Sequence, residues 1–201
     1  MDPKYVMHVI REPLAGKAFE LMDAVVEQRA NMGITEGITT ASIASPRMLI
    51  VTTTPYESLA DLQTRADGIF DSEEARAQWD RIGAFASSTV NSLSRVIVPP
   101  EGRETANYFQ RYVFTHDTSS RRQLLGALQE MNAQGTGPDL GISASISGGQ
   151  VIVSRGVDSL SDLEEPWDRL AEDPGTIARA ASVLANCTDW GSGIAKVISR
   201  P

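Results

Sequence analysis

Two histidines, one in each half of the chain, are the side chains best suited to proton transfer. His8 lies in the segment MHVIRE, and its imidazole could act near neutral pH as a general base or as a hydrogen-bond donor. Arg111 and Tyr112 are adjacent in the second half, where they could orient an anionic or enolic substrate. These three residues are our candidates for catalysis. The alternative is that His8 is a packed, hydrogen-bonded residue and that Arg111 lies on a solvent-exposed edge.

Three more residues are candidates for binding a substrate. Arg11 lies on the first predicted strand, with a solvated edge position as its alternative. His116 comes just before Asp117 at the end of a predicted strand, where a turn or capping role is the alternative. Trp190 stands beside the glycines of Gly191–Gly193 and could line a pocket, or it could simply pack at a core or an edge.

Sequence motifs for cofactors and metals are missing from the chain. The single cysteine, Cys187, excludes an intrachain disulfide and a cysteine-cluster metal site. The segment GTGPDLG at 135–141 precedes a predicted strand and does not open a helix, so it does not predict a phosphate-binding loop. We therefore expect no bound cofactor and no metal. A haem with one of the two histidines as its axial ligand is a third possibility.

Composition and charge limit the classes of partner. The chain has 201 residues, 41% of them hydrophobic, and carries a net charge of −8 from 18 basic and 26 acidic side chains. Because the basic residues are scattered, we expect neither nucleic acid nor an anionic membrane surface as a partner, but a small-molecule ligand. The N-terminal segment shows no signal peptide, and no apolar run is long enough for a membrane span, so we expect a cytoplasmic protein.

Periodic apolar residues and turn signals predict strands and helices in the same order in both halves. In the first half, the order is strand Tyr5–Glu12, helix Ala15–Met32, strands Ile38–Ala44 and Met48–Thr54, helix Glu57–Phe70, a helix capped at Asp71-Ser72, and strand Leu93–Val98. In the second half, the strands are Gln110–Thr115, Ile142–Ile146, Val151–Ser154 and Ile194–Ile198, and the helices are Ser120–Gln134, Ser159–Leu170 and Thr176–Ala185.

The two halves also resemble each other in sequence. The segment ESLADL at 57–62 returns as DSLSDL at 158–163, and ten of 44 positions are identical when 57–100 is aligned with 158–201. Chance would give about three identities at ordinary residue frequencies. The front parts align at an offset near 104, which pairs His8 with Tyr112. We interpret this as a duplication, with units at 1–100 and 101–201 and a linker at about 99–107; coincidence of two amphipathic helices is the alternative.

The β-α-β-β-α-β order resembles the dimeric α/β-barrel superfamily, which includes antibiotic-biosynthesis-type monooxygenases and NIPSNAP-like proteins. The resemblance rests on VIREPLAGKAFEL at Val9–Leu21, on Ser58–Trp79, and on Ser159–Ala180 in the second half. It implies an α+β fold in which two tandem ferredoxin-like units pair their sheets into one intrachain α/β barrel, with pockets between sheet and helices. Usual members form this barrel by dimerisation, and a homodimer of the fused barrel stays open.

The same resemblance implies a small-molecule enzyme that works like the cofactor-independent monooxygenases on an aromatic or polyketide-like metabolite. His8, Arg111 and Tyr112 would position and deprotonate the substrate, and oxygen would react with the resulting carbanion. The alternative is a non-catalytic metabolite-binding or accessory protein with the same barrel, because few titratable side chains lie on the predicted strands. An apolar pocket with two or three converging polar groups would favour the enzyme.

Overall fold

The computed structural model describes residues 3–99, 105–133 and 140–200. The chain divides into two compact units: the first comprises residues 1–94 and 196–201, and the second comprises residues 95–195. Part of the predicted linker at 99–107 and part of the segment GTGPDLG at 135–141 lie outside the described residues.

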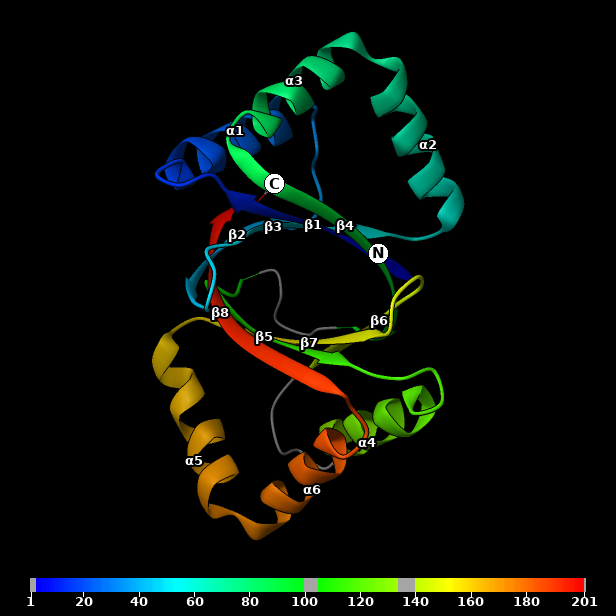
Figure 1. Cartoon of the computed structure of the whole chain (residues 1–201), viewed down its shortest axis with the longest axis vertical. Coiled ribbons are helices and arrows are strands. Elements are labelled where there is room, and N and C mark those ends of the chain that lie inside the picture. The colour runs from blue at the N-terminus through cyan, green and yellow to red at the C-terminus, as the bar shows by residue number, and fades with distance from the viewer. Residues whose placement is uncertain (1–2, 100–104, 134–139, 201) are drawn as a thin grey trace. The chain divides into compact units, whose positions relative to one another are not determined.

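The first unit has four strands and three helices in its described residues. They are β1 (Tyr5–Pro13), α1 (Ala18–Asn31), β2 (Ile38–Ala44), β3 (Ile50–Tyr56), α2 (Leu59–Asp71), α3 (Glu73–Gly83) and β4 (Ala86–Val98), whose residues from Arg95 on are counted in the second unit. Strand β3 pairs antiparallel with both β1 and β2, and β4 lies beside β1, where the amide of Leu14 donates to the carbonyl of Phe85 at 2.9 Å. All three helices lie on one face of this sheet (Figure 1).

The second unit, over its described residues, has the same order with one additional short helix. Its elements are β5 (Tyr108–Thr115), α4 (Arg121–Ala133), β6 (Gly141–Ser145), β7 (Gln150–Val157), the 3₁₀ helix η1 (Leu160–Leu163), α5 (Glu164–Glu172), α6 (Pro174–Leu184) and β8 (Asp189–Ser199), whose residues from Lys196 on are counted in the first unit. Strand β7 pairs antiparallel with β5 and β6, and the amide of Thr188 links the start of β8 to Thr115 at 2.8 Å. The helices α4, α5 and α6 again lie on one face of the sheet (Figure 1). The predicted α+β class is confirmed, whereas the duplication and the pairing of two sheets into one barrel stay predictions.

Each unit buries its own apolar core between the sheet and the helices. In the first unit, Leu21 and Val25 of α1 pack with Ile50 of β3 and Ile82 of α3. In the second unit, the core is larger and consists of Phe114, Leu124, Leu128, Leu140, Ile142, Ala144, Val151, Val153 and Val183. Removing this apolar surface from water is the main free-energy term that holds the helices on their sheets.

The last strand of each unit is longer than the sequence predicts. Strand β4 starts at Ala86 and not at Leu93, and β8 starts at Asp189 and not at Ile194. The added residues of both strands are mostly exposed on both faces. Apolar alternation marks a strand only where one of its faces is buried, so these segments gave no signal.

Two other predicted elements differ because of prolines. The helix predicted at Ser159–Leu170 is a 3₁₀ turn followed by α5, with Pro166 in the first turn of α5, where a missing N–H is tolerated. The strand predicted to end at Thr54 continues to Tyr56 through Pro55. Since β2 pairs with β3 only up to Thr53, Pro55 lies beyond that ladder and removes no bond from it.

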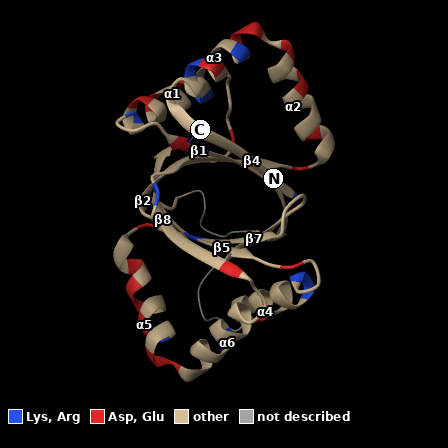
Figure 2. Cartoon of the chain, in the orientation of Figure 1, with Lys and Arg blue, Asp and Glu red and all other residues tan. Residues whose placement is uncertain are grey.

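Charged residues are distributed over the helices of both units. Figure 2 shows acidic residues along α2, α3 and α5. Among the described residues, no helix combines the length and the hydropathy that crossing a bilayer requires.

The core of the second unit yields a first prediction. Leu128 on α4 is fully buried, and its neighbour Gln129 is exposed. We expect Leu128→Ala to lower the free energy of unfolding by about 2–5 kcal/mol, because it removes apolar contacts and leaves a cavity. Gln129→Ala on the same helix is the matched control and should change it by less than about 0.5 kcal/mol. Urea denaturation followed by circular dichroism measures both, and equal effects of the two variants would contradict this description of the core.

The cap of α6 yields a second prediction. The Asp173 carboxylate accepts hydrogen bonds from the hydroxyl of Thr176 at 2.6 Å and from its amide at 2.7 Å. These bonds hold the pKa of Asp173 below its ordinary 3.8. A depressed folded-state pKa stabilises the fold above the ordinary value, and this contribution is lost as pH falls through the folded value. We expect Asp173→Asn to be less stable than wild type at neutral pH and to match it well below pH 3.8 in thermal denaturation; a difference that persists in acid would contradict the assignment.

Candidate functional site

The register of the first strand of each unit decides which of its side chains face the helices. His8 is paired with Thr53, and Arg111 is paired with Ser154, which lies 101 residues after Thr53 (154 − 53). The two first strands are therefore equivalent at an offset of 103, and His8 corresponds to Arg111. The predicted offset of 104, which paired His8 with Tyr112, is wrong by one residue. A one-residue slip moves every side chain of a strand to the other face.

The sheet face that carries each core identifies the helix side. Ile50 belongs to the core of the first unit and is paired with Arg11, so Arg11 lies on the helix side and His8 on the opposite face. The His8 Nδ1 atom lies 3.1 Å from the hydroxyl of Thr53 on that face. In the second unit, Tyr112 is paired with the core residue Val153 and faces the helices, whereas Arg111 faces away from them.

The second unit holds a pocket on the helix side of its sheet. It has a volume of about 150 Å³ and is bounded by β5, β7 and the three helices. Most of its lining is apolar or aromatic: Phe114, Met131, Leu140, Val153, Pro166, Trp167, Leu170, Ala180, Val183, Leu184 and Trp190. Its polar lining residues are Gln110, Tyr112, Arg155 and Thr176. An apolar pocket with a few converging polar groups is typical of small-molecule sites.

Tyr112 is the central polar group of this pocket. Its phenol oxygen accepts a hydrogen bond from Gln110 Nε2 at 2.7 Å and a second one from the indole of Trp167. A phenol has two acceptor positions and one proton, so its own O–H stays available to donate to a ligand. Burial raises the pKa of Tyr112 above its ordinary 10, and this outweighs the nearby charge of Arg155 and the bond from Trp167. Tyr112 is thus a neutral hydrogen-bond donor at physiological pH.

Arg155 supplies the positive charge of the pocket, and sequence reasoning missed it. It is only 8% exposed and lies opposite Gln110 on the neighbouring strand. A signal was present in the sequence, because Arg155 alternates with Val151, Val153 and Val157 on the otherwise apolar face of β7. A charged residue on the core face of a strand is costly to bury and therefore marks a functional candidate.

The half-exposed rim of the pocket is aromatic. Trp167 is 42% exposed and Trp190 is 51% exposed, and both line the pocket. Large apolar side chains that border a pocket and remain partly in water are typical of a ligand-binding rim. Of the six predicted site residues, Tyr112 and Trp190 are brought together in this pocket.

The other four predicted site residues lie elsewhere. His8 and Arg11 belong to the first unit, on opposite faces of β1. Arg111 has its guanidinium 5.6 Å from the ring centre of Phe109. His116 is buried and donates from Nδ1 to the carbonyl of Asp117 at 3.0 Å, which is the turn position that the sequence offered as its alternative.

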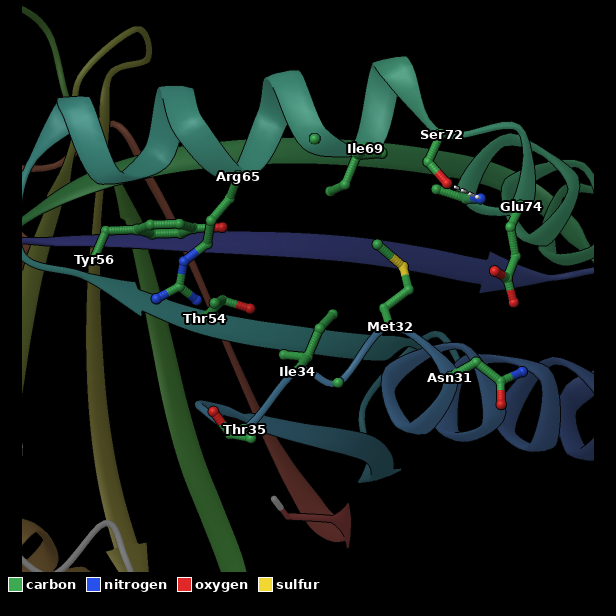
Figure 3. Close-up of a pocket in the computed structure, with 13 residues that line it drawn as sticks. Asn31, Met32, Ile34, Thr35, Thr54, Tyr56, Arg65, Ile69, Ser72 and Glu74 are labelled. Carbon is green, nitrogen blue, oxygen red and sulfur yellow. Dashed lines mark hydrogen bonds between the residues drawn. The ribbon is translucent and has the colours of Figure 1, made fainter.

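The first unit has its own cavity on the helix side of its sheet, with a volume of about 540 Å³. Figure 3 shows Tyr56 and Arg65 at one end, Asn31, Ser72 and Glu74 at the other, and Met32, Ile34 and Ile69 between them. Arg65 lies 5.0 Å from the ring centre of Tyr56 and forms ion pairs with Glu36 at 2.9 Å and Asp61 at 3.1 Å. The two carboxylates exceed the single positive charge of Arg65, so these three side chains together carry a net charge of −1.

The two cavities differ in the chemistry that their sheets provide. At the offsets fixed by the strand registers, Gln110, Tyr112 and Arg155 correspond to Met7, Val9 and Thr54. None of these three counterparts can donate a proton from a phenol or carry a charge. At these three sheet positions, a phenol and a cation occur together in the second unit and not in the first, whose cavity instead has Tyr56 beside Arg65.

The described residues do not gather three or more His, Cys, Asp or Glu side chains into a metal-binding group. None of the described residues that line the pocket of the second unit is a histidine or a carboxylate. This pocket therefore offers a hydrogen-bond donor, a positive charge and aromatic surface, but no strong general base.

Comparisons with known proteins complete the description. No protein-family model matches the chain, and no curated protein matches its sequence. Among solved structures, an anthrone oxidase-like protein is similar with a TM-score of 0.69 at 17% identity, covering 98% of this chain and 92% of its own. A candidate monooxygenase from Fusobacterium nucleatum has a TM-score of 0.72 at 8% identity, with coverages of 99% and 94%.

A third similar solved structure is described as a ferredoxin-fold protein. A ferredoxin-fold protein from Listeria monocytogenes, related to antibiotic biosynthesis monooxygenases, has a TM-score of 0.51 at 9% identity and covers 98% of this chain and 96% of its own. At such identities a similarity establishes the fold and not the activity. The chain therefore has the ferredoxin-like fold found among proteins related to the antibiotic biosynthesis monooxygenases.

Proposed function

We propose that the second unit binds a phenolic or enolic aromatic compound and promotes its oxidation by molecular oxygen, without a bound cofactor. The observation that carries this proposal is the pairing of the Tyr112 phenol with the buried charge of Arg155 in an aromatic pocket. The similarity of the fold to an anthrone oxidase-like protein and to a candidate monooxygenase supports the same reaction class.

The size of the pocket supports a substrate with one buried ring. A dry apolar cavity of about 150 Å³ is enough to hold benzene, and the pocket of the second unit has about this volume. The remaining part of a fused-ring compound would lie at the rim, between Trp167 and Trp190. Aromatic side chains favour such a position through offset or edge-to-face packing.

The two polar groups stabilise the anionic form of the substrate. A donated hydrogen bond from Tyr112 and the positive charge of Arg155 both lower the free energy of an enolate or phenolate oxygen placed between them. Because the described lining contains no strong base, the substrate itself must be acidic enough to lose its proton to water or buffer once these groups stabilise its anion. This requirement favours enolisable polyphenols over simple aromatic rings.

The carbanion form of such a compound can react with oxygen directly. In the overall reaction, a ring CH₂ group and O₂ give a ring C=O group and one molecule of water. One oxygen atom forms the new carbonyl, and the other leaves as water with the two hydrogens of the CH₂ group. Atoms and electrons balance without any additional reductant, so the residues of the pocket only need to orient and stabilise the anion.

A binding role without catalysis is the second candidate function. The lack of a general base among the described lining residues favours it, since proton transfer is the usual task of a catalytic side chain in such reactions. In that case the same compound would bind to Tyr112 and Arg155 but would not consume oxygen.

Oxygen uptake tests the proposal. With 1,8-dihydroxyanthrone as the probe, we expect the protein to accelerate oxygen consumption and formation of the corresponding anthraquinone. Tyr112→Phe should lower kcat about 100-fold with little change in KM, because it removes a hydrogen bond that strengthens as charge develops. Arg155→Gln should lower kcat/KM as well, through loss of the charge that stabilises the bound anion.

Tyr5→Phe is the matched control, because Tyr5 lies at the start of β1 in the first unit. This variant should keep the full rate. Unchanged oxygen uptake in Tyr112→Phe would rule out the proposed role of Tyr112. Binding of the quinone product without any acceleration of oxygen uptake would select the non-catalytic candidate instead.

A further inference from the structure

Two arginines of the first unit are buried without a carboxylate partner among the described residues. Arg11 on β1 is 5% exposed, and Arg29 on α1 is 4% exposed. None of the ion pairs formed within residues 3–99, 105–133 and 140–200 involves either guanidinium. A buried charge without a counter-charge is costly, and proteins usually compensate it with an ion pair or a bound anion.

Neutral groups satisfy these two side chains only in part. Arg11 Nη1 donates to the hydroxyl of Thr52 at 3.1 Å, while its Nε is buried and has no hydrogen-bond partner in the described part of the chain. Arg29 Nη2 donates to the carbonyls of Glu36 at 2.9 Å and Gly37 at 3.1 Å, while its Nη1 is likewise buried without a partner there. Burial lowers the pKa of both groups, that of Arg11 to about 10, so both are charged at neutral pH.

Thr54 lines the 540 Å³ cavity, and the two guanidinium groups lie outside this lining but contact residues near Thr54 in the sheet, namely Thr52 and Gly37. Thr52 precedes Thr54 by two residues on the same face of β3, about 7 Å along the strand. On the other side, Gly37 packs so closely on β3 that a Cβ atom there would lie 2.1 Å from the carbonyl oxygen of Thr53. Arg11 thus lies beside Thr52 on β3. Arg29 lies beside Gly37, which directly precedes β2.

The other charges around the cavity offset these two only in part. Arg65 is paired with the carboxylates of Glu36 and Asp61, so these three side chains together carry a net charge of −1 and are partly exposed to water. Glu74 lies at the opposite end of the cavity from Tyr56 and Arg65 and is exposed, so water screens its charge (Figure 3). Near Thr54, the two buried cations therefore outweigh the net charge of −1 of the partly exposed Arg65 group, because a low dielectric strengthens the field of buried charges.

We propose that this cavity binds a small amphipathic carboxylate. The carboxylate group lies over Thr54, within the field of Arg11 and Arg29, and accepts a hydrogen bond from the Thr54 hydroxyl. The apolar body lies along Met32, Ile34 and Ile69, which line the middle of the cavity (Figure 3). A volume of about 540 Å³ is within the usual range for small-molecule sites.

This site is separate from the oxidation proposed for the second unit and does not depend on it. It uses different residues, a different cavity and a different property of the ligand, which is a permanent negative charge in place of an enolisable ring. The chain would then bind two different compounds, one in each unit.

Two-dimensional ¹H–¹⁵N NMR of the full chain, with 2-naphthoate as the probe and uncharged 2-naphthamide as its isosteric match, tests the proposal. We expect 2-naphthoate to shift the backbone amides of residues 31–35 and 68–75 and to bind at least 10-fold more tightly than 2-naphthamide, about 1.4 kcal/mol. This comparison uses the wild-type protein and so does not depend on whether a variant folds.

Variants then identify the cations. Arg11→Met and Arg29→Met should each weaken 2-naphthoate binding at least 10-fold and leave 2-naphthamide binding unchanged. Arg81→Met is the matched control, since Arg81 is an exposed arginine of the same unit, paired with Glu27. Arg155→Gln should leave the shifts at 31–35 intact, which separates this site from the pocket of the second unit.

Three results would overturn the proposal. The first is equal affinity for the carboxylate and the amide. The second is a set of shifts confined to residues outside the first unit's cavity. The third is the absence of any shift at the solubility limit of 2-naphthoate. None of these results bears on oxygen uptake by the second unit.

Discussion

The alternation of side chains along β1 and β5 is the constraint on which the rest of the structure depends. Each of these strands is paired with its neighbour so that every second residue faces the helices. The helix-facing residues either join the apolar core or enter a cavity, and their neighbours in sequence cannot reach either. The chemistry of each unit therefore depends on whether its polar residues stand at the helix-facing positions of the strand or at the positions between them.

This constraint explains why the two units differ although they share an order of elements. In the second unit, the helix-facing positions include a glutamine and a tyrosine on β5 and an arginine on β7. In the first unit, these positions include an arginine near the C-terminal end of β1 and threonines on β3. A helix-facing arginine thus lines the pocket in the second unit, whereas Arg11 is not among the residues that line the cavity of the first. A common scaffold with different polar residues at equivalent positions is the usual way in which one fold supports several functions.

Much of the fold could be predicted from the sequence, and the candidate site only in part. The order of strands and helices follows from apolar periodicity. The register between the two halves was not predictable, because the loop that follows each first strand differs in length and sequence alignment places a gap only approximately. This difference of one residue in the offset is why His8 corresponds to Arg111 and not to Tyr112. Arg155 could have been found as a charged residue among valines, whereas its proximity to Tyr112 depends on the pairing of β5 with β7.

Helices α2 and α5 cover parts of the two cavities, yet neither has a single fully buried residue. Substitutions on such helices cost little stability, because they disturb few packed contacts. The walls that touch a ligand can therefore change over evolutionary time while the sheets and the remaining helices keep the fold intact. Because the helix walls tolerate substitution and the sheets are tightly packed, the ligand preference of each unit can change by mutations that cost little stability.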